Sequence, residues 1–120
     1  MQPDQRDLAS VLDMLKYARR ARNLVAGRSF GEYLSSYEFR HSVERVVEII
    51  GEAASQVSRP FRRAHPEIPG SDITGMRVIL VHKYGTVQPR RVWETMMEDT
   101  PTLIAHLEAL LPPDAPDPGD

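Results

Sequence analysis

At residues 75–85 the chain reads GMRVILVHKYG, and the rest of the sequence is organised around this stretch. Its apolar residues predict a core helix, with an arginine before the apolar run and a histidine and a tyrosine after it. On a regular helix Arg77 and Tyr84 lie about 20° apart, whereas His82 lies about 140° from Arg77. Arg77 and His82 therefore meet only if the helix unwinds near Gly85 or if a twofold axis brings a second copy of the segment alongside.

Two interpretations of these polar residues are open. In the first, Arg77 binds a phosphate group while His82 moves a proton, and together they cleave an RNA phosphodiester without a metal ion. In the second, His82 is satisfied near a helix end and Arg77 pairs with an acidic residue such as Glu94 or Asp99. The spacing alone favours the second interpretation.

The length and composition of the chain exclude several other classes. A chain of 120 residues is one domain by size, and its net charge of −2 provides no overall positive field for nucleic acid. The absence of cysteine excludes disulfides and thiolate metal sites. The N-terminus lacks the order of a signal peptide, and no apolar run approaches the roughly 20 residues that span a bilayer. We therefore expect a soluble cytoplasmic protein with no membrane contact.

Apolar residues recur at three- and four-residue steps, and no segment alternates with a period of two. The pattern predicts an all-α fold, an up-and-down antiparallel bundle of four to five helices within residues 1–111. The segment 61–71 is interrupted by prolines and is expected to hold at most one helical turn. The tail, residues 112–120, is rich in proline and aspartate and is predicted to be disordered. The four main helices are expected over residues 6–26, 36–57, 71–85 and 89–111, and the last is expected either to kink or to restart at Thr100 and Pro101.

Local signals refine this outline. Ser29 and Glu32 have capping-box spacing, Gly27 is placed to end the first helix in a left-handed conformation, and Gly85 is placed to end the third. Gly51 lies inside the second helix, where it costs about 1 kcal/mol relative to alanine, and this predicts a close helix–helix crossing. Three acidic residues share one stripe of that helix and are assigned to its solvated face: Glu44, Glu48 and Glu52.

Basic residues near the opening stretch are candidates for guiding RNA, although such groups often form an ordinary solvated face. They are Lys83, Arg90 and Arg91. The other histidines show no metal-ligand spacing, so neither a metal nor a cofactor is predicted. They are His41, His65 and His106. Trp93 is expected in the core.

The sequence resembles a known family over nearly all of its length except the tail. Residues 77–84, RVILVHKY, match the R-x4-H-x-Y motif of HepT-like toxins in the HEPN family. Further segments fall in the order that this family shows, and this succession of matches is more specific than the short motif. They are SVER at 42–45, EIIGEA at 48–53, HPEIP at 65–69, VW at 92–93 and DTPTL at 99–103.

The resemblance implies a dimeric HEPN bundle in which the motifs of two chains line a shared cleft. It implies a metal-independent RNA endonuclease, acting on RNA such as tRNA, as the toxin of a type VII-like toxin–antitoxin pair. Arg77 and His82 would be catalytic. The antitoxin would be a minimal nucleotidyltransferase, MntA, which in some pairs transfers AMP to the motif tyrosine, here Tyr84.

One position departs from the family. Val78 stands where the family commonly has a polar residue, often asparagine, and valine cannot hydrogen-bond a substrate. We therefore expect weakened turnover. The alternative is a non-catalytic HEPN module that only binds its nucleotidyltransferase partner. A third interpretation is a structural helical dimer in which His82 is buried.

Overall fold

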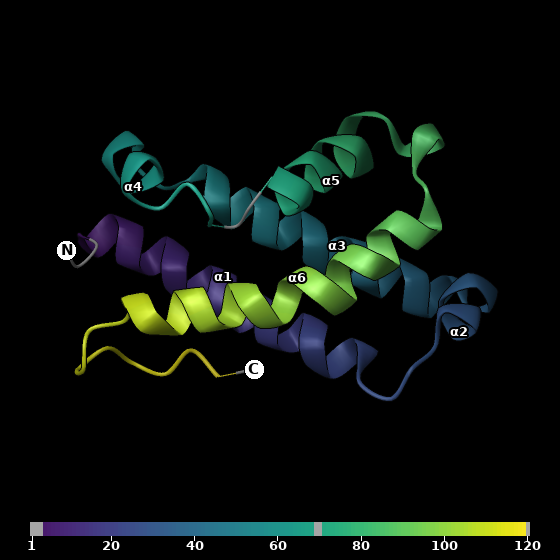
Figure 1. Cartoon of the computed structure of the whole chain (residues 1–120), viewed down its shortest axis with the longest axis horizontal. Helices are drawn as coiled ribbons and strands as arrows, with labels where there is room; N and C mark the ends of the chain where they lie inside the picture. The colour runs from purple at the N-terminus through teal and green to yellow at the C-terminus, as the bar shows by residue number, and fades with distance from the viewer. Residues whose placement is uncertain (1–3, 69–70, 120) are drawn as a thin grey trace.

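The computed structural model describes residues 4–68 and 71–119, apart from the side chains of residues 71 and 72. Those residues form six α-helices and one 3₁₀ turn, with no strand among them. Four long helices run alternately in opposite directions, which confirms the predicted all-α, up-and-down architecture (Figure 1). In chain order the elements are α1 (Gln5–Val25), α2 (Phe30–Ser35), α3 (Tyr37–Ser55), α4 (Arg59–Ala64), α5 (Ser71–His82), η1 (Tyr84–Thr86) and α6 (Pro89–Leu110).

The packing of the helices leaves α5 at one side of the bundle. Helix α1 packs mainly against α3 and α6, whereas α5 packs against α3 and, less extensively, against α6. The side of α5 that faces away from these helices carries two exposed apolar residues, Val78 at 41% and Val81 at 47% exposure. The expected cap of this helix, Ser71 or Asp72, falls on side chains outside the described part of the chain.

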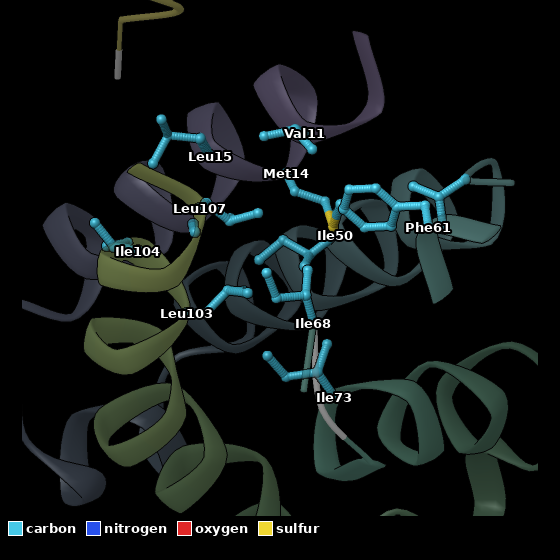
Figure 2. Close-up of a cluster of buried hydrophobic side chains, with 12 residues drawn as sticks. Val11, Met14, Leu15, Ile50, Phe61, Ile68, Ile73, Leu103, Ile104 and Leu107 are labelled. Atoms are coloured by element: carbon cyan, nitrogen blue, oxygen red, sulfur yellow. The ribbon is translucent and has the colours of Figure 1, made fainter. Parts of the chain in front are cut away.

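Two clusters of buried side chains form the core. Figure 2 shows the first, in which side chains of α1, α3 and α6 meet around Met14, Ile50 and Leu107. The second surrounds Trp93, whose ring lies 5.5 Å from that of Tyr33 and 6.0 Å from that of Phe39, measured between centroids. Burial of each such side chain stabilises the fold by about 1.5–3 kcal/mol. The predicted core position of Trp93 is confirmed, since the residue is 8% exposed.

Most predicted helix ends are confirmed. Ser29 and Glu32 form the capping box at the start of α2, and Gly27 has a φ of +71° just after α1. The prediction that Gly85 ends the third helix is wrong, because α5 ends at His82 and Gly85 does not have a positive φ. The chain leaves the helix at Lys83 and makes the 3₁₀ turn η1 instead.

The last helix and the tail complete the chain. Helix α6 runs from Pro89 to Leu110 with Pro101 inside it, so the helix does not restart at Pro101. The described tail residues, 112–119, form no helix, and Arg19 donates from Nη1 to Oδ1 of Asp117 at 2.8 Å. The predicted disorder of this tail stays a prediction. None of the helices in the described part of the chain is long and apolar enough to cross a membrane.

Candidate functional site

Arg77 is held against α3 at Gly51. A Cβ atom built on Gly51 would lie only 2.7 Å from Cβ and from Cδ of Arg77, a distance that real side chains do not tolerate. Only glycine therefore lets the aliphatic part of this arginine pass so close to the α3 backbone. The predicted close crossing at Gly51 is confirmed, and its partner on α5 is the candidate catalytic arginine.

One nitrogen of the Arg77 guanidinium, Nε, is buried and has no hydrogen-bond partner in the described part of the chain. An unpaired buried N–H group costs about 1–3 kcal/mol, so this position is unfavourable for the isolated chain. In the second interpretation of the sequence, Arg77 pairs with Glu94 or Asp99, but its Nε donates to neither of them. Arg77 is thus seated on α3 with a buried N–H group that is unused within the described residues.

His82 lies at the C-terminal end of α5 and is exposed. It is not a core histidine of this chain. Helix α5 stays regular from Arg77 to His82, so the two side chains point about 140° apart. Arg77 faces α3 while His82 faces solvent, and one chain does not bring them together.

Tyr84 is tied to a buried carboxylate of α3. Its hydroxyl donates to Oε1 of Glu44 at 2.7 Å, and the hydroxyl of Tyr33 approaches Oε2 of the same residue at 3.4 Å. Glu44 is 4% exposed and Tyr33 is fully buried, whereas Tyr84 is 47% exposed. The carboxylate therefore lies between two phenols, one in the core and one at the surface.

This arrangement changes the acidity of both phenols. The pKa of Tyr84 is raised above its ordinary value chiefly because its hydroxyl donates to Glu44, with burial and the nearby carboxylate charge adding to the effect. The pKa of Tyr33 is also raised, chiefly by burial and then by the charge of Glu44. Both tyrosines therefore stay protonated well into the alkaline range.

The assignment of Glu44 to a solvated stripe is wrong, since the residue is buried and its carboxylate bonds to Tyr33 of α2 and Tyr84 of η1. Glu44, Val47 and Gly51 follow one another at intervals of three and four residues, and all three are buried on α3. This shared stripe with an apolar residue and a glycine is the signal in the sequence that could have placed Glu44 inward. Tyr33 carries no comparable signal, because its role depends on a carboxylate of another helix.

The three basic residues proposed to guide RNA are exposed and lie just after α5 or in the first turn of α6. The guanidinium of Arg90 lies over the ring of Phe30 at 4.4 Å, which fixes its direction. The part in RNA guiding of Lys83, Arg90 and Arg91 stays a prediction. The described residues contain no cluster of three or more side chains suited to hold a metal ion.

Comparison with known proteins defines the class to which this fold and motif belong. The family model described as ribonuclease HepT-like matches residues 14–110, and the chain belongs to this family. It is 40% identical over 81 residues to a protein of Thermococcus cleftensis named "Probable ribonuclease HepT", covering 68% of this chain and 74% of the relative. It is 30% identical over 108 residues to a Methanocaldococcus jannaschii protein with a provisional RNase name, covering 89% of each. No solved structure matches the chain at a significant level.

Proposed function

We propose that the chain is an RNA endonuclease that cleaves phosphodiester bonds with Arg77 and His82 and without a metal ion. The observation that carries this proposal is the way in which the Arg77 side chain is packed and left without a partner at Nε. This side chain is seated on Gly51, yet its buried Nε has no partner within the described part of the chain. A fixed guanidinium with an unused N–H suits a phosphate oxygen. Membership of the HepT-like family and the ribonuclease names of its relatives support the same reaction.

The chemistry divides between the two side chains. His82 takes the proton of a ribose 2′-hydroxyl, the 2′-oxygen bonds to the adjacent phosphorus, and the bond from phosphorus to the 5′-oxygen breaks. The leaving 5′-oxygen takes up a proton, so the products carry a 2′,3′-cyclic phosphate and a 5′-hydroxyl. Arg77 stabilises the negative charge that grows on the phosphoryl oxygens. Histidine suits this role because it exchanges protons near neutral pH.

The site is completed by a second copy of the chain. Arg77 and His82 point about 140° apart on a helix that stays regular between them, which favours pairing between chains over pairing within one. The exposed Val78 and Val81 flank His82 on the outward side of α5 and provide an apolar surface for the partner copy. The two α5 helices of such a dimer would each supply an arginine to the histidine of the other.

Cleavage of cellular RNA, including tRNA, by the purified protein tests the reaction. We expect Arg77→Ala and His82→Ala each to lower the turnover by about a hundredfold or more. Arg63→Ala and His106→Ala, which change the same residue types elsewhere, should keep the activity of the unmodified protein. Equal activity in the unmodified chain and in the Arg77 and His82 variants would refute the proposal.

Mixing the two inactive variants tests whether the site is shared. A dimer of one Arg77→Ala chain and one His82→Ala chain retains one intact arginine–histidine pair if the pair forms between chains. We therefore expect part of the activity to return when the proteins are mixed and allowed to exchange subunits. If the pair forms within each chain, every site in the mixture stays defective and no activity returns.

In the cell, we propose that the chain acts as a toxin that a minimal nucleotidyltransferase, MntA-like, neutralises by transferring AMP to Tyr84. The hydroxyl of Tyr84 is the nucleophile: it bonds to the α-phosphorus of ATP, pyrophosphate leaves, and the phenolic proton is released. Glu44 lies 2.7 Å from this hydroxyl and is placed to accept that proton. The product carries a phosphodiester beside a site that must bind RNA phosphate, and the like charges repel. Co-expression with a minimal nucleotidyltransferase, followed by the mass of the Tyr84 peptide, tests this step.

The alternative function, a non-catalytic module that only binds the nucleotidyltransferase, is favoured by one observation. Val78 is 41% exposed directly after Arg77, where a polar side chain could contact the substrate. This alternative predicts a stable complex with the partner, no RNA cleavage and no growth arrest when the chain is expressed alone. Growth arrest that disappears in the His82→Ala variant would exclude it.

A further inference from the structure

A cavity of about 600 Å³ opens between the C-terminal part of α3, helix α4 and the first half of α5. Arg77 forms part of its wall. Figure 1 shows the three helices that carry most of its lining, α3, α4 and α5. Its volume is within the range of small-molecule sites, roughly 300–1,000 Å³. Apart from Gly51, Arg77 and Val78, none of its lining residues has a role proposed above.

The charged side chains that line the cavity are all basic. Arg62 of α4, His65 just after α4, and Arg77 of α5 contribute to the wall, and the described lining residues include no aspartate or glutamate. Arg62 donates from Nη2 to the carbonyl oxygen of Ser55 at 2.8 Å, which fixes the guanidinium at the rim and leaves its other N–H groups to donate. The buried Nε of Arg77 adds a donor without a partner among the described residues.

His65 is positioned by its neighbours. Its ring lies 4.8 Å from that of Phe61, between centroids, and its Nδ1 is 3.8 Å from a carboxylate oxygen of Glu67. This contact occupies one ring nitrogen and leaves the other for a further hydrogen bond. The wall therefore carries hydrogen-bonding groups of three basic side chains, which suits an anion with several acceptor oxygens.

The rest of the wall is apolar and determines what kind of anion fits. Ala54 of α3, Pro66 and Ile68 of the connection, and Val78 of α5 line the cavity beside the basic groups. A free inorganic anion would leave these surfaces exposed to water, whereas a nucleotide covers them with its sugar and base. The combination of basic and apolar walls thus fits a nucleotide.

We propose that this cavity binds the nucleotide of the RNA strand next to the cleaved bond, with its phosphate on Arg62 and His65. The proposal rests on the proposed RNA cleavage, because Arg77 is the residue shared between the cavity and the scissile phosphate. The strand runs from the cleaved bond past Arg77 into the cavity. Arg62 and His65 are then substrate-binding residues that set affinity, while Arg77 and His82 set turnover.

The test compares two neighbouring arginines of α4. Arg62 lines the cavity and Arg63 does not, although both are exposed and carry the same charge. Binding of a short single-stranded RNA is measured by fluorescence anisotropy in the His82→Ala background, which prevents cleavage. We expect Arg62→Ala to weaken binding by about ten- to a hundredfold and Arg63→Ala to match the background protein. The slope of log affinity against log salt should fall by about 0.7 for Arg62→Ala, the value for one phosphate contact to a single strand.

The outcomes separate this proposal from the proposed reaction. If the protein cleaves RNA while Arg62→Ala and Arg62→Glu bind RNA as the background does, the cavity proposal is overturned and the reaction stands. If the protein cleaves nothing while Arg62→Ala still weakens RNA binding, the cavity proposal stands and the reaction fails. A parallel titration with AMP provides a third arm. Binding of AMP that depends on Arg62, together with RNA binding that does not, assigns the cavity to a free nucleotide and overturns the strand assignment.

Discussion

The contact between Gly51 and Arg77 leads to a sharp prediction about stability. In Gly51→Ala the new methyl group would lie 2.7 Å from Cβ and Cδ of Arg77. Because the Cβ atom is bonded to the α5 backbone, the clash is relieved only by a shift of α5 relative to α3, not by rotation of a flexible end. Overpacking of this kind costs about 1–3 kcal/mol. Alanine in a helix interior gains about 1 kcal/mol over glycine, so the net destabilisation is about 0–2 kcal/mol.

Gly75→Ala is the matched control for this change. Gly75 lies inside α5, and a Cβ atom there would meet nothing within 4 Å. This variant gains the helix preference without the clash, so it should be more stable than the unmodified chain by up to about 1 kcal/mol. The difference between the two variants cancels the helix preference and isolates the clash, about 1–3 kcal/mol.

The free energy of unfolding of both variants is measured in urea at one protein concentration. Unfolding is followed by circular dichroism and by the fluorescence of Trp93, the single tryptophan, which is buried. Stabilisation of Gly51→Ala to the same extent as Gly75→Ala would refute the close approach of α3 and α5. A shift of α5 also moves the guanidinium, so RNA cleavage should fall in Gly51→Ala. The activity control is Gly31→Ala on α2, where the nearest atom to a new Cβ is the Ser29 hydroxyl at an ordinary 3.7 Å.

Two further variants test buried carboxylates. Glu44→Gln should bring the pKa of Tyr84 back towards its ordinary value, because the hydrogen bond to Glu44 is the main cause of the upward shift. The pKa of Tyr33 should stay raised, because burial is the main cause of its shift. A tyrosine pKa that is raised in the folded state stabilises the fold below about pH 10, and this stabilisation is lost as the pH rises through the raised pKa. In the variant, an ultraviolet titration of tyrosinate should therefore show ionisation at lower pH. Alkaline unfolding should also occur at lower pH. A titration of Tyr84 unchanged by the substitution would contradict this. Asp7→Ala should cost about 2–4 kcal/mol in urea unfolding, because buried Asp7 accepts hydrogen bonds from the backbone N–H and the hydroxyl of Ser58, each at 2.7 Å. A loss below 0.5 kcal/mol would contradict the role of this contact.

The outline of the fold could be predicted from the sequence because it depends on local patterns. Apolar residues at helical spacing marked all four long helices, and Ser29 and Glu32 marked the start of α2. Glycine alone was not sufficient to place the end of α5. Gly27 ends α1 with a positive φ, but Gly85 does not, because the chain has already left the helix at Lys83.

The candidate site was only partly predictable, for a reason that lies in its contacts. Arg77, His82 and Tyr84 are close in the sequence and formed a recognisable motif. The groups that hold Arg77 and Tyr84 come from α3, 26 and 40 residues earlier in the chain, at Gly51 and Glu44. Charge alone placed Glu44 in solvent, and only the packing of α5 on α3 shows that two tyrosine hydroxyls replace the lost water.

Two contacts join α3 to α5 and to the turn η1 that follows it, and their order leads to a last prediction. Arg77 of α5 and Tyr84 of η1 are seven residues apart, and their partners Gly51 and Glu44 are seven residues apart on α3 in the reverse order, as antiparallel segments require. On α3, seven residues are two turns, about 10 Å, so the two contacts hold α5 and η1 against the same surface of one helix.

A loss of one contact should therefore change the effect of losing the other. The shift of α5 that relieves the clash in Gly51→Ala is opposed by the hydrogen bond at Glu44, and Glu44→Gln weakens that restraint. We expect the stability changes of these two variants to depart from additivity by at least about 0.5 kcal/mol, whereas Gly51→Ala combined with Gly31→Ala should add within about 0.3–0.5 kcal/mol. Additive behaviour of both pairs would mean that Arg77 and Tyr84 are seated independently. The proposed AMP group on Tyr84, which replaces the hydrogen donated to Glu44, would then act on RNA binding by its bulk and charge alone.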